Sequence, residues 1–130
     1  MIATKSLSEP VNKKRDGLRI LASRFRGHGV SKSQYDVWMA NLGPSDPLLR
    51  KFLDEKITWA QFRTQYRREI LQGFGYEEPN QKLRNSGQKF TLRLLKHLAA
   101  QQPITLLCHC GKEDMQCHRH VLKELIETMK

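Results

Sequence analysis

A short segment near the end of the sequence, Cys108–His120 (CHCGKEDMQCHRH), holds all three cysteines and three of the five histidines of the chain. A cysteine thiolate is a nucleophile, and cysteine sulfur and histidine nitrogen are ligands that zinc prefers. Histidine also exchanges protons near neutral pH. The segment could therefore support thiol chemistry, anion binding or metal binding, and the surrounding elements decide which of these groups meet.

This segment lies between a predicted strand and a predicted helix. Residues 104–108 (ITLLC) form a short apolar run that is typical of a fully buried strand, and a helix is expected to begin near Cys117. The first turn of a helix offers backbone N–H groups and a positive dipole, which bind anions and lower the pKa of a thiol. We therefore expect Cys117 to be the most reactive thiol and Cys108, which ends the apolar strand, the least reactive.

The first hypothesis is an anion-binding or nucleotide-related site that could be enzymatic. Its candidate catalytic residues are Cys117, His118 and Arg119. Its candidate ligand-binding residues are Arg24, His28 and Lys112. Arg24 and His28 belong to a second loop, residues 24–29 (RFRGHG), which follows another short apolar run. Basic groups on both loops favour an anionic small molecule as the ligand.

The second hypothesis is a metal site of the zinc type. Cys108 and Cys110 project to one face of an extended chain, and Cys117 with His118 or His120 could complete a set of four ligands. The spacing lacks the paired two-residue knuckles of familiar zinc modules. The third interpretation is that the cysteines are buried without a chemical role, as free cysteines often are. The sequence leaves all three interpretations open.

Composition limits the class of protein. The 130 residues, 38% of them hydrophobic, leave room for one domain with one core. The formal net charge of +10 favours acidic partners, so a non-catalytic nucleic-acid-binding module is the alternative function. No apolar run suits a signal peptide or a membrane-spanning helix, and three clustered cysteines do not suit a secreted disulfide scaffold. We therefore expect a cytoplasmic protein that does not contact a membrane.

The first part of the chain predicts two strands and one helix. Residues 1–16 are polar and basic and predict a flexible arm, with a short strand at 2–7, ahead of a single domain over 17–130. Residues 18–23 (LRILAS) predict a buried strand. Ser31 is expected to cap a helix whose apolar face contains Tyr35, Trp38, Met39 and Leu42.

Three more helices are predicted from capping residues and helical spacing. Ser45 or Asp46 with Pro47 begins a short one. Thr58 begins a longer one, in which the aromatic residues are expected to lie in the core. Residues 73–87, rich in Gly, Asn and Pro, predict a mobile loop or a lid. The last of the three helices ends before Pro103, and its apolar stripe consists of Phe90, Leu94, Leu95 and Leu98.

Strands that alternate with helices predict a single α/β domain, a small parallel, Rossmann-like sheet with helices packed on it. Open α/β sheets collect their ligand-binding loops at the carboxyl ends of the strands. We therefore expect Arg24 and His118 to lie near one another, each just beyond a buried strand.

Several segments, in this order, resemble the short, YeaO-like branch of the domain-of-unknown-function family 488. They are Asp16-Gly17 with Arg19–Leu21, Arg24 with Gly29 and Ser31-Lys32, Trp38 with Pro44-Ser45, Leu49–Phe52, Phe62-Arg63 with Tyr66 and Glu69, and Ile104–Leu107. The resemblance implies an α/β fold with both loops at one edge of the sheet. Where that branch has Asp-Arg-Leu-Trp-Pro-Arg-Gly, this chain has SRFRGHG, and Cys117-His118-Arg119 is similar to a Cys-His-Arg motif of the longer branch. The family implies no settled activity and no settled cofactor, although zinc suits the cysteines.

Overall fold

The computed structural model describes residues 2–27, 29–72, 75–76, 84–85, 87–111 and 114–129. Its strands are β1 (Ile2–Ser6), β2 (Leu18–Leu21), β3 (Val37–Trp38), β4 (Gly75–Tyr76), β5 (Arg84–Asn85) and β6 (Ile104–Cys108). Its α-helices are α1 (Lys13–Asp16), α2 (Asp46–Leu53), α3 (Trp59–Gln72), α4 (Lys89–Ala99) and α5 (His118–Thr128). Two short 3₁₀ helices, Lys32–Gln34 and Ala40–Leu42, flank β3.

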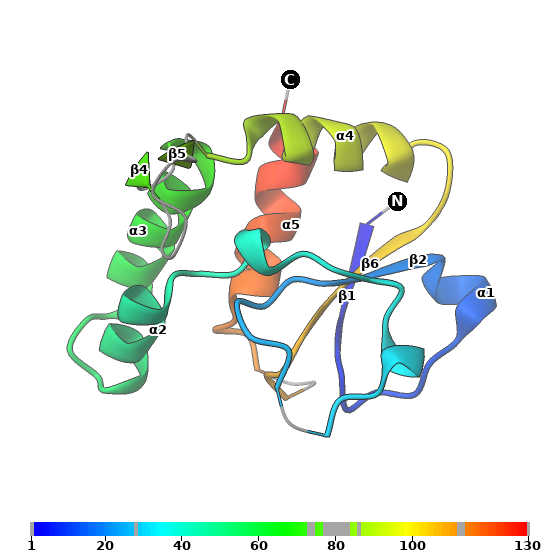
Figure 1. Ribbon diagram of the computed structural model, residues 1–130, viewed down its shortest axis with the longest axis horizontal. Helices are drawn as coiled ribbons and strands as arrows, with labels where there is room; N and C mark the ends of the chain where they lie inside the picture. The colour runs from blue at the N-terminus through cyan, green and yellow to red at the C-terminus, as the bar shows by residue number, and fades with distance from the viewer. Residues whose placement is uncertain are drawn as a thin grey trace.

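Within the described residues, four strands form a parallel sheet in the order β1-β6-β2-β3, and β4 and β5 form a separate antiparallel pair (Figure 1). The last strand in the sequence, β6, lies between the first two. All five of its residues are buried, which matches its continuous apolar sequence. Helices pack on the sheet, so the expected single α/β domain is confirmed.

One face of the sheet carries the apolar core. Ile20 and Ala22 from the β2 segment and Ile104 and Leu106 from β6 point to this face, alternating with residues that point to the other. Helix α5 packs on β1 and β6 and also contacts α3 and α4. Because α5 follows β6 directly, its first turn is fixed at the carboxyl end of the central strand (Figure 1).

The other face of the sheet carries Leu21 and Leu107 and, beside them, buried charged residues that are paired. The buried Asp16 accepts hydrogen bonds from Lys5, at Nζ–Oδ1 3.1 Å, and from the backbone of Asn12. Arg19 is also buried and binds Asp36 through both Nε and Nη2. These pairs satisfy charges that would otherwise be costly to bury.

Local signals explain the helices next to the site. Ser45 caps α2, with Pro47 in the first turn, and Glu69 of α3 accepts hydrogen bonds from the Ser45 N–H and hydroxyl. Thr58 and Gln61 form reciprocal backbone–side-chain hydrogen bonds at the start of α3. The aromatic residues of α3 lie in the core, as predicted, and Tyr66 donates its hydroxyl to the carbonyl oxygen of Leu42 at 2.6 Å.

Three predictions from the sequence were wrong. The strand expected at 2–7 forms β1, but residues 2–16 are part of the fold rather than a flexible arm, because β1 pairs with β6 along its whole length and Asp16 is buried. Residues 31–42 form two 3₁₀ turns and the edge strand β3 instead of one helix, because Asp36 is drawn to Arg19 and β3 pairs with β2. In α4 the buried residues are Leu92, Leu95 and Ala99, whereas Phe90 and Leu94 are exposed.

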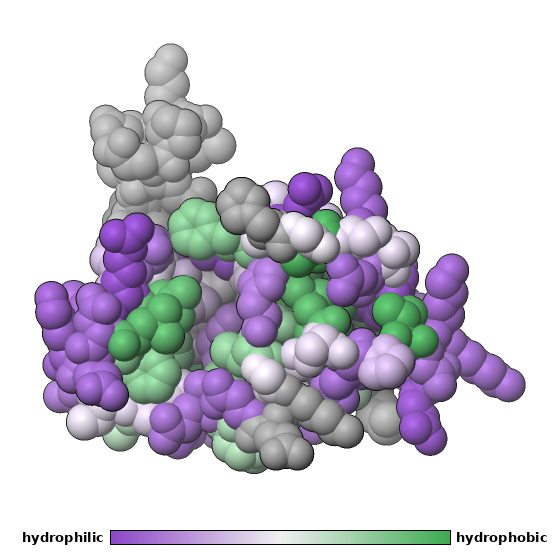
Figure 2. Space-filling view, turned by 90° about the horizontal axis from the view of Figure 1, so that it is seen from below, coloured by the Kyte–Doolittle hydropathy of each residue, from purple (hydrophilic) through white to green (hydrophobic). Residues whose placement is uncertain are grey.

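Figure 2 views the molecule from the side of the strands' carboxyl ends and shows separate apolar patches between hydrophilic side chains. None of the described helices is long and apolar enough to cross a membrane. The loop predicted over residues 73–87 lies mostly outside the described residues, so its predicted mobility stays a prediction.

Candidate functional site

The three cysteines meet where β6 ends and α5 begins. Cys108 is the last residue of β6, Cys117 is the N-cap of α5, and Cys110 belongs to the loop between them. Their Sγ atoms all lie within 4.8 Å of one another, and none forms a disulfide. The Sγ atoms of Cys108 and Cys117 lie 2.9 Å apart. The three thiols of this segment therefore meet at one point.

Arg119 brings a positive charge into this cluster. Its side chain is buried, with 1% of the residue exposed, and its Nη1 donates a hydrogen bond to the Sγ of Cys108 at 2.8 Å. Nη2 donates to the carbonyl oxygen of Gly111 at 3.1 Å, and Nη1 also reaches the carbonyl oxygen of Cys110. One guanidinium thus fixes the loop after β6 and faces the thiol of Cys108.

The negative charge of the cluster concentrates on Cys108. Hydrogen bonds from Cys110 and Cys117 lower the pKa of Cys108, burial opposes them, and the charges of His118 and Arg119 lower it further. The hydrogen bond to Cys108 raises the pKa of Cys110, and hydrogen bonds to both neighbours together with burial raise the pKa of Cys117. The arrangement is one thiolate that accepts hydrogen bonds from two thiols and one guanidinium.

This distribution corrects the expectation that the start of α5 lowers the pKa of Cys117. The backbone N–H of Arg119 does act on Cys117 in the expected direction, but it is the weakest of the five influences on that thiol. Hydrogen bonds to Cys108 and Cys110, together with burial, outweigh the effect of the helix start on Cys117.

His118 is buried beside the thiols. Its Nε2 forms a hydrogen bond with the carbonyl oxygen of Ala22, its ring packs edge-on against Tyr66, and its Nδ1 lies 3.9 Å from the Sγ of Cys117. Burial lowers the pKa of the imidazole. A carbonyl oxygen only accepts, so Nε2 carries the proton, and in a neutral imidazole Nδ1 is then a proton acceptor that faces Cys117.

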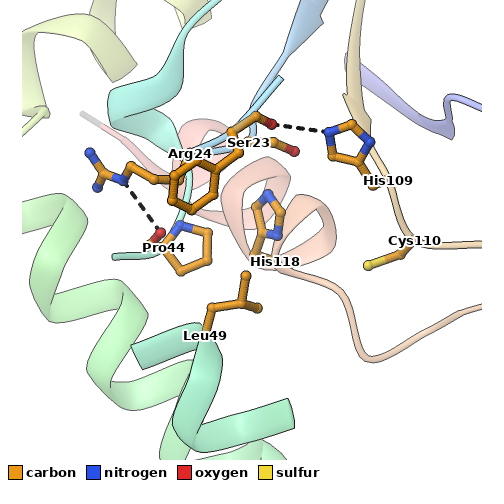
Figure 3. A pocket seen from close by; sticks show the side chains of 8 residues that line it. Ser23, Arg24, Pro44, Leu49, His109, Cys110 and His118 are labelled. Atoms are coloured by element: carbon orange, nitrogen blue, oxygen red, sulfur yellow. Dashed lines mark hydrogen bonds between the residues drawn. The ribbon is translucent and has the colours of Figure 1, made fainter. Parts of the chain in front are cut away.

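A pocket of about 120 Å³ opens beside the cluster. Figure 3 shows its walls, which come from the loop after β2, the segment before and within α2, and the loop after β6. The lining residues are Ser23, Arg24, Phe25, Pro44, Leu49, His109, Cys110 and His118. Of the three cysteines, Cys110 lines this pocket, and its sulfur points into the space between His118 and Leu49 (Figure 3).

The loops that bound the pocket hold each other in place. Nε2 of His109 forms a hydrogen bond with the carbonyl oxygen of Phe25 at 3.0 Å. Gly27 has a φ of +86° and lies so close to His109 that an added Cβ would be 2.7 Å from its Cε1. On the other side, Arg24 donates to the carbonyl oxygens of Gly43 and Pro44. The pocket wall is therefore defined by contacts between three separate segments.

The predicted proximity of Arg24 and His118 is confirmed: β2 and β6 are paired, and both residues line the same pocket. The guanidinium of Arg24 turns away from His118 toward Pro44 (Figure 3). His28 and Lys112 lie outside the described residues. His120 does not join the thiols, because its Nε2 contacts the carbonyl oxygen of Asp114.

Sequence reasoning missed His109 and the apolar wall formed by Phe25, Pro44 and Leu49. Strand alternation gave no signal for His109, because it would place this residue opposite Cys110, whereas both lie in the loop after β6 and line the same pocket. The apolar wall gave no signal of its own, because it is formed only when α2 packs opposite the loop after β2.

The three sulfur atoms are close enough to hold one metal ion. Thiolate donors suit zinc, and the Nδ1 of His118 is the nearest further donor. Such an ion would share the sulfur of Cys108 with the guanidinium of Arg119, which already supplies a positive charge at that atom.

Comparison with known proteins places these residues in a wider group. A family model with the name DUF488-N3a, described as the active DUF488-N3 subclade, matches residues 2–130. The chain is 29% identical over 130 residues to the uncharacterized protein YeaO of Escherichia coli K12, and the alignment covers 98% of each chain. No solved structure matches the chain. The resemblance to family 488 that the sequence motifs indicated is confirmed.

Proposed function

Because this chain belongs to the DUF488-N3a family, the active DUF488-N3 subclade, we propose that it is a thiol-dependent enzyme that acts on a small anionic molecule through a thiolate at Cys108. The observation that carries the proposal is the buried contact between Arg119 Nη1 and Cys108 Sγ at 2.8 Å. Arginine keeps its charge in proteins, and a buried charge needs an opposite charge nearby. Cys108 is an acidic side chain in contact with that guanidinium.

Cys117 and His118 support this role for Cys108. The thiol of Cys117, 2.9 Å from Cys108, stabilises the thiolate by donating a hydrogen bond. The Nδ1 of His118 faces Cys117 at 3.9 Å and is available to accept its proton. Protons can therefore move between the sulfur atoms and an imidazole whose orientation is fixed by Ala22.

The charges around the pocket favour an anionic substrate. Arg24 and His109 line it, Arg119 and the start of α5 lie behind it, and the formal net charge of the chain is +10. A volume of about 120 Å³ is small for a ligand site, so the pocket admits a small molecule or one end of a larger one, such as part of a nucleotide.

The ultraviolet absorbance of the thiolate tests this function, because it does not depend on reagents reaching a buried sulfur. The wild-type protein, treated with chelator, is expected to contain a thiolate at neutral pH. Cys108→Ser should lose that signal, whereas Cys117→Ala and Cys110→Ala should retain it with a higher pKa, since each removes one hydrogen-bond donor. A signal that is absent from the wild type, or that persists in Cys108→Ser, would overturn the proposal.

A bound metal is the second candidate, favoured by the spacing of the three Sγ atoms within 4.8 Å. Cys108, Cys110 and Cys117 would hold the ion, with His118 as a fourth ligand. Elemental analysis of protein purified without a histidine tag separates the two functions. About one zinc per chain, lost on changing Cys110 to Ser, would favour the metal site. Metal well below that amount would favour the free thiolate.

A further inference from the structure

We propose that the substrate of this thiol site is a low-molecular-weight disulfide, that Cys110 is the sulfur that attacks it, and that Cys108 then displaces the bound half. The inference rests on the proposed function, because it uses Cys108 as the thiolate. It adds the class of substrate and assigns different roles to the three cysteines.

The three thiols differ in their exposure to solvent. Cys108 is fully buried and Cys117 is 2% exposed, so neither can meet a substrate in the folded protein. Cys110 is partly exposed, and its sulfur lines the pocket (Figure 3). A molecule that enters the pocket therefore reaches Cys110 first, while the best-stabilised thiolate lies behind it.

Distance makes the second step feasible. Cys108 and Cys110 carry sulfur atoms within 4.8 Å of each other and are hydrogen bonded. A disulfide bond is about 2.0 Å long, so a rotation of the two side chains can bring the sulfur atoms together. Most nucleophilic catalysis needs only one cysteine. A thiolate with two further thiols close enough to form a disulfide suits a reaction that ends in a sulfur–sulfur bond.

The reaction balances without another oxidant. Cys110 passes its proton to the Cys108 sulfur and attacks one sulfur of the substrate R–S–S–R, forming a mixed disulfide and releasing RS⁻. That leaving group takes the proton from Cys108 and departs as RSH. The Cys108 thiolate then attacks the sulfur of Cys110, forming the Cys108–Cys110 disulfide, and the bond to R breaks to release a second RS⁻. The substrate disulfide is reduced by two electrons, and the two cysteines are oxidised by two.

The pocket suits a disulfide with an apolar centre. Phe25, Pro44 and Leu49 offer an apolar wall for the sulfur atoms and their methylene groups. His109 and Arg24 also line the pocket, and the guanidinium of Arg24 faces Pro44. Oxidised glutathione, a disulfide that carries carboxylates, is the probe that matches this chemistry.

The experiment mixes reduced, chelator-treated protein with oxidised glutathione, quenches with acid and maps the sulfur bonds by peptide mass. Cys108→Ser should accumulate glutathione on Cys110, because the thiol that releases it is gone. Wild type and Cys117→Ser should proceed to the Cys108–Cys110 disulfide, through a transient adduct on Cys110. Cys110→Ser should lose the reaction, and because Cys110 is partly exposed this variant is a mild structural change.

Stable glutathione on Cys108 or Cys117 in the wild type would overturn the inference, as would a reaction that persists in Cys110→Ser. If Cys108→Ser does not fold, the time course of Cys117→Ser decides, since the adduct on Cys110 must appear before the internal disulfide. A protein that shows the thiolate absorbance but never forms the adduct refutes this inference and leaves the proposed function intact. Loss of the thiolate signal refutes the proposed function itself.

Discussion

At the residue scale, the geometry of Arg119 determines the chemistry of the site. The guanidinium binds a sulfur atom and two carbonyl oxygens in different directions, which a planar group with several donors can do and an ammonium cannot. The shape of this side chain matters as much as its charge.

Arg119→Lys is therefore expected to raise the pKa of Cys108 by about one unit. Lysine keeps a positive charge but loses the contacts that hold the loop against Cys108. Thiolate absorbance as a function of pH measures the change. Arg68→Lys, at an exposed position on α3, serves as the control and should leave the titration unchanged.

Asp36 and Arg19 provide a second residue-scale prediction. The side-chain hydrogen bond from Arg19 lowers the pKa of Asp36 below 3.8. Asp36→Asn should reduce the free energy of unfolding at neutral pH by about 1 kcal/mol, a modest loss because the carboxylate is partly exposed. Urea unfolding measures it.

The difference between wild type and Asp36→Asn should depend on pH. A carboxylate whose folded pKa is lowered contributes its stability above its unfolded pKa of about 3.9, and that contribution is lost as the pH falls through the folded pKa. The two proteins should therefore approach equal stability below about pH 4. A constant difference from pH 7 down to pH 3 would mean that the contact with Arg19 does not depend on the charge.

The sequence indicated which residues meet in the site but not which sulfur is charged. Cys117, His118 and Arg119 were correctly placed at a helix start, because an apolar strand and a helical apolar pattern bracket them. The charge on Cys108 depends on how far the side chain of Arg119 reaches backward. That direction is a property of packing and has no signature in the spacing of residues.

At the scale of elements, the loop after β2 depends on two glycines in different surroundings. Gly27 and Gly29 both have positive φ, +86° and +76°. An added Cβ on Gly27 would collide with His109, whereas one on Gly29 would meet no described atom within 4 Å. A comparison of the two positions therefore separates the cost of a left-handed backbone from the effect of disturbing the contact between His109 and Phe25.

Both Gly27→Ala and Gly29→Ala should lose about 1–2 kcal/mol of stability from the left-handed backbone. Gly27→Ala should lose more, and it should also increase the reactivity of Cys110 toward alkylating reagents, because His109 must move away from Phe25. Urea unfolding and timed alkylation measure the two effects. Equal behaviour of the two variants would show that His109 does not hold this loop.

The sequence predicted a strand or helix correctly where its apolar residues are the ones that are buried. It failed where pairing with another strand or packing against another helix decides the structure. The buried positions of β6 are apolar except Thr105, and those of α5 are apolar after its first two residues, so the pattern identified both. Tyr35, Trp38, Met39 and Leu42 fit a helical stripe, yet β3 forms because its backbone pairs with β2 and the Trp38 indole donates to the carbonyl oxygen of Ser23. In α4 two equally apolar faces compete, and the choice of Leu92 over Phe90 depends on the neighbouring helix.

At the scale of the whole molecule, β6 is the centre of both the sheet and the core. It has a paired strand on each side and no exposed residue. The backbone amides of β6 should therefore exchange with solvent most slowly, by global unfolding, while those of the edge strand β3 exchange faster. Hydrogen exchange followed by NMR measures both. Faster exchange in β6 than in β3 would contradict the arrangement of the sheet.

The position of β6 also has a consequence for synthesis. In the finished sheet β6 lies between β1 and β2. These two strands leave the ribosome early, but they cannot join one sheet until residues 104–108 emerge. The cysteines follow within a few residues, and Arg119 comes after them. A nascent chain thus carries ordinary thiols with no guanidinium against them. The contact between Arg119 and Cys108 forms only when β6 and α5 join the fold. By then the segments that bury Cys108 have already been synthesised.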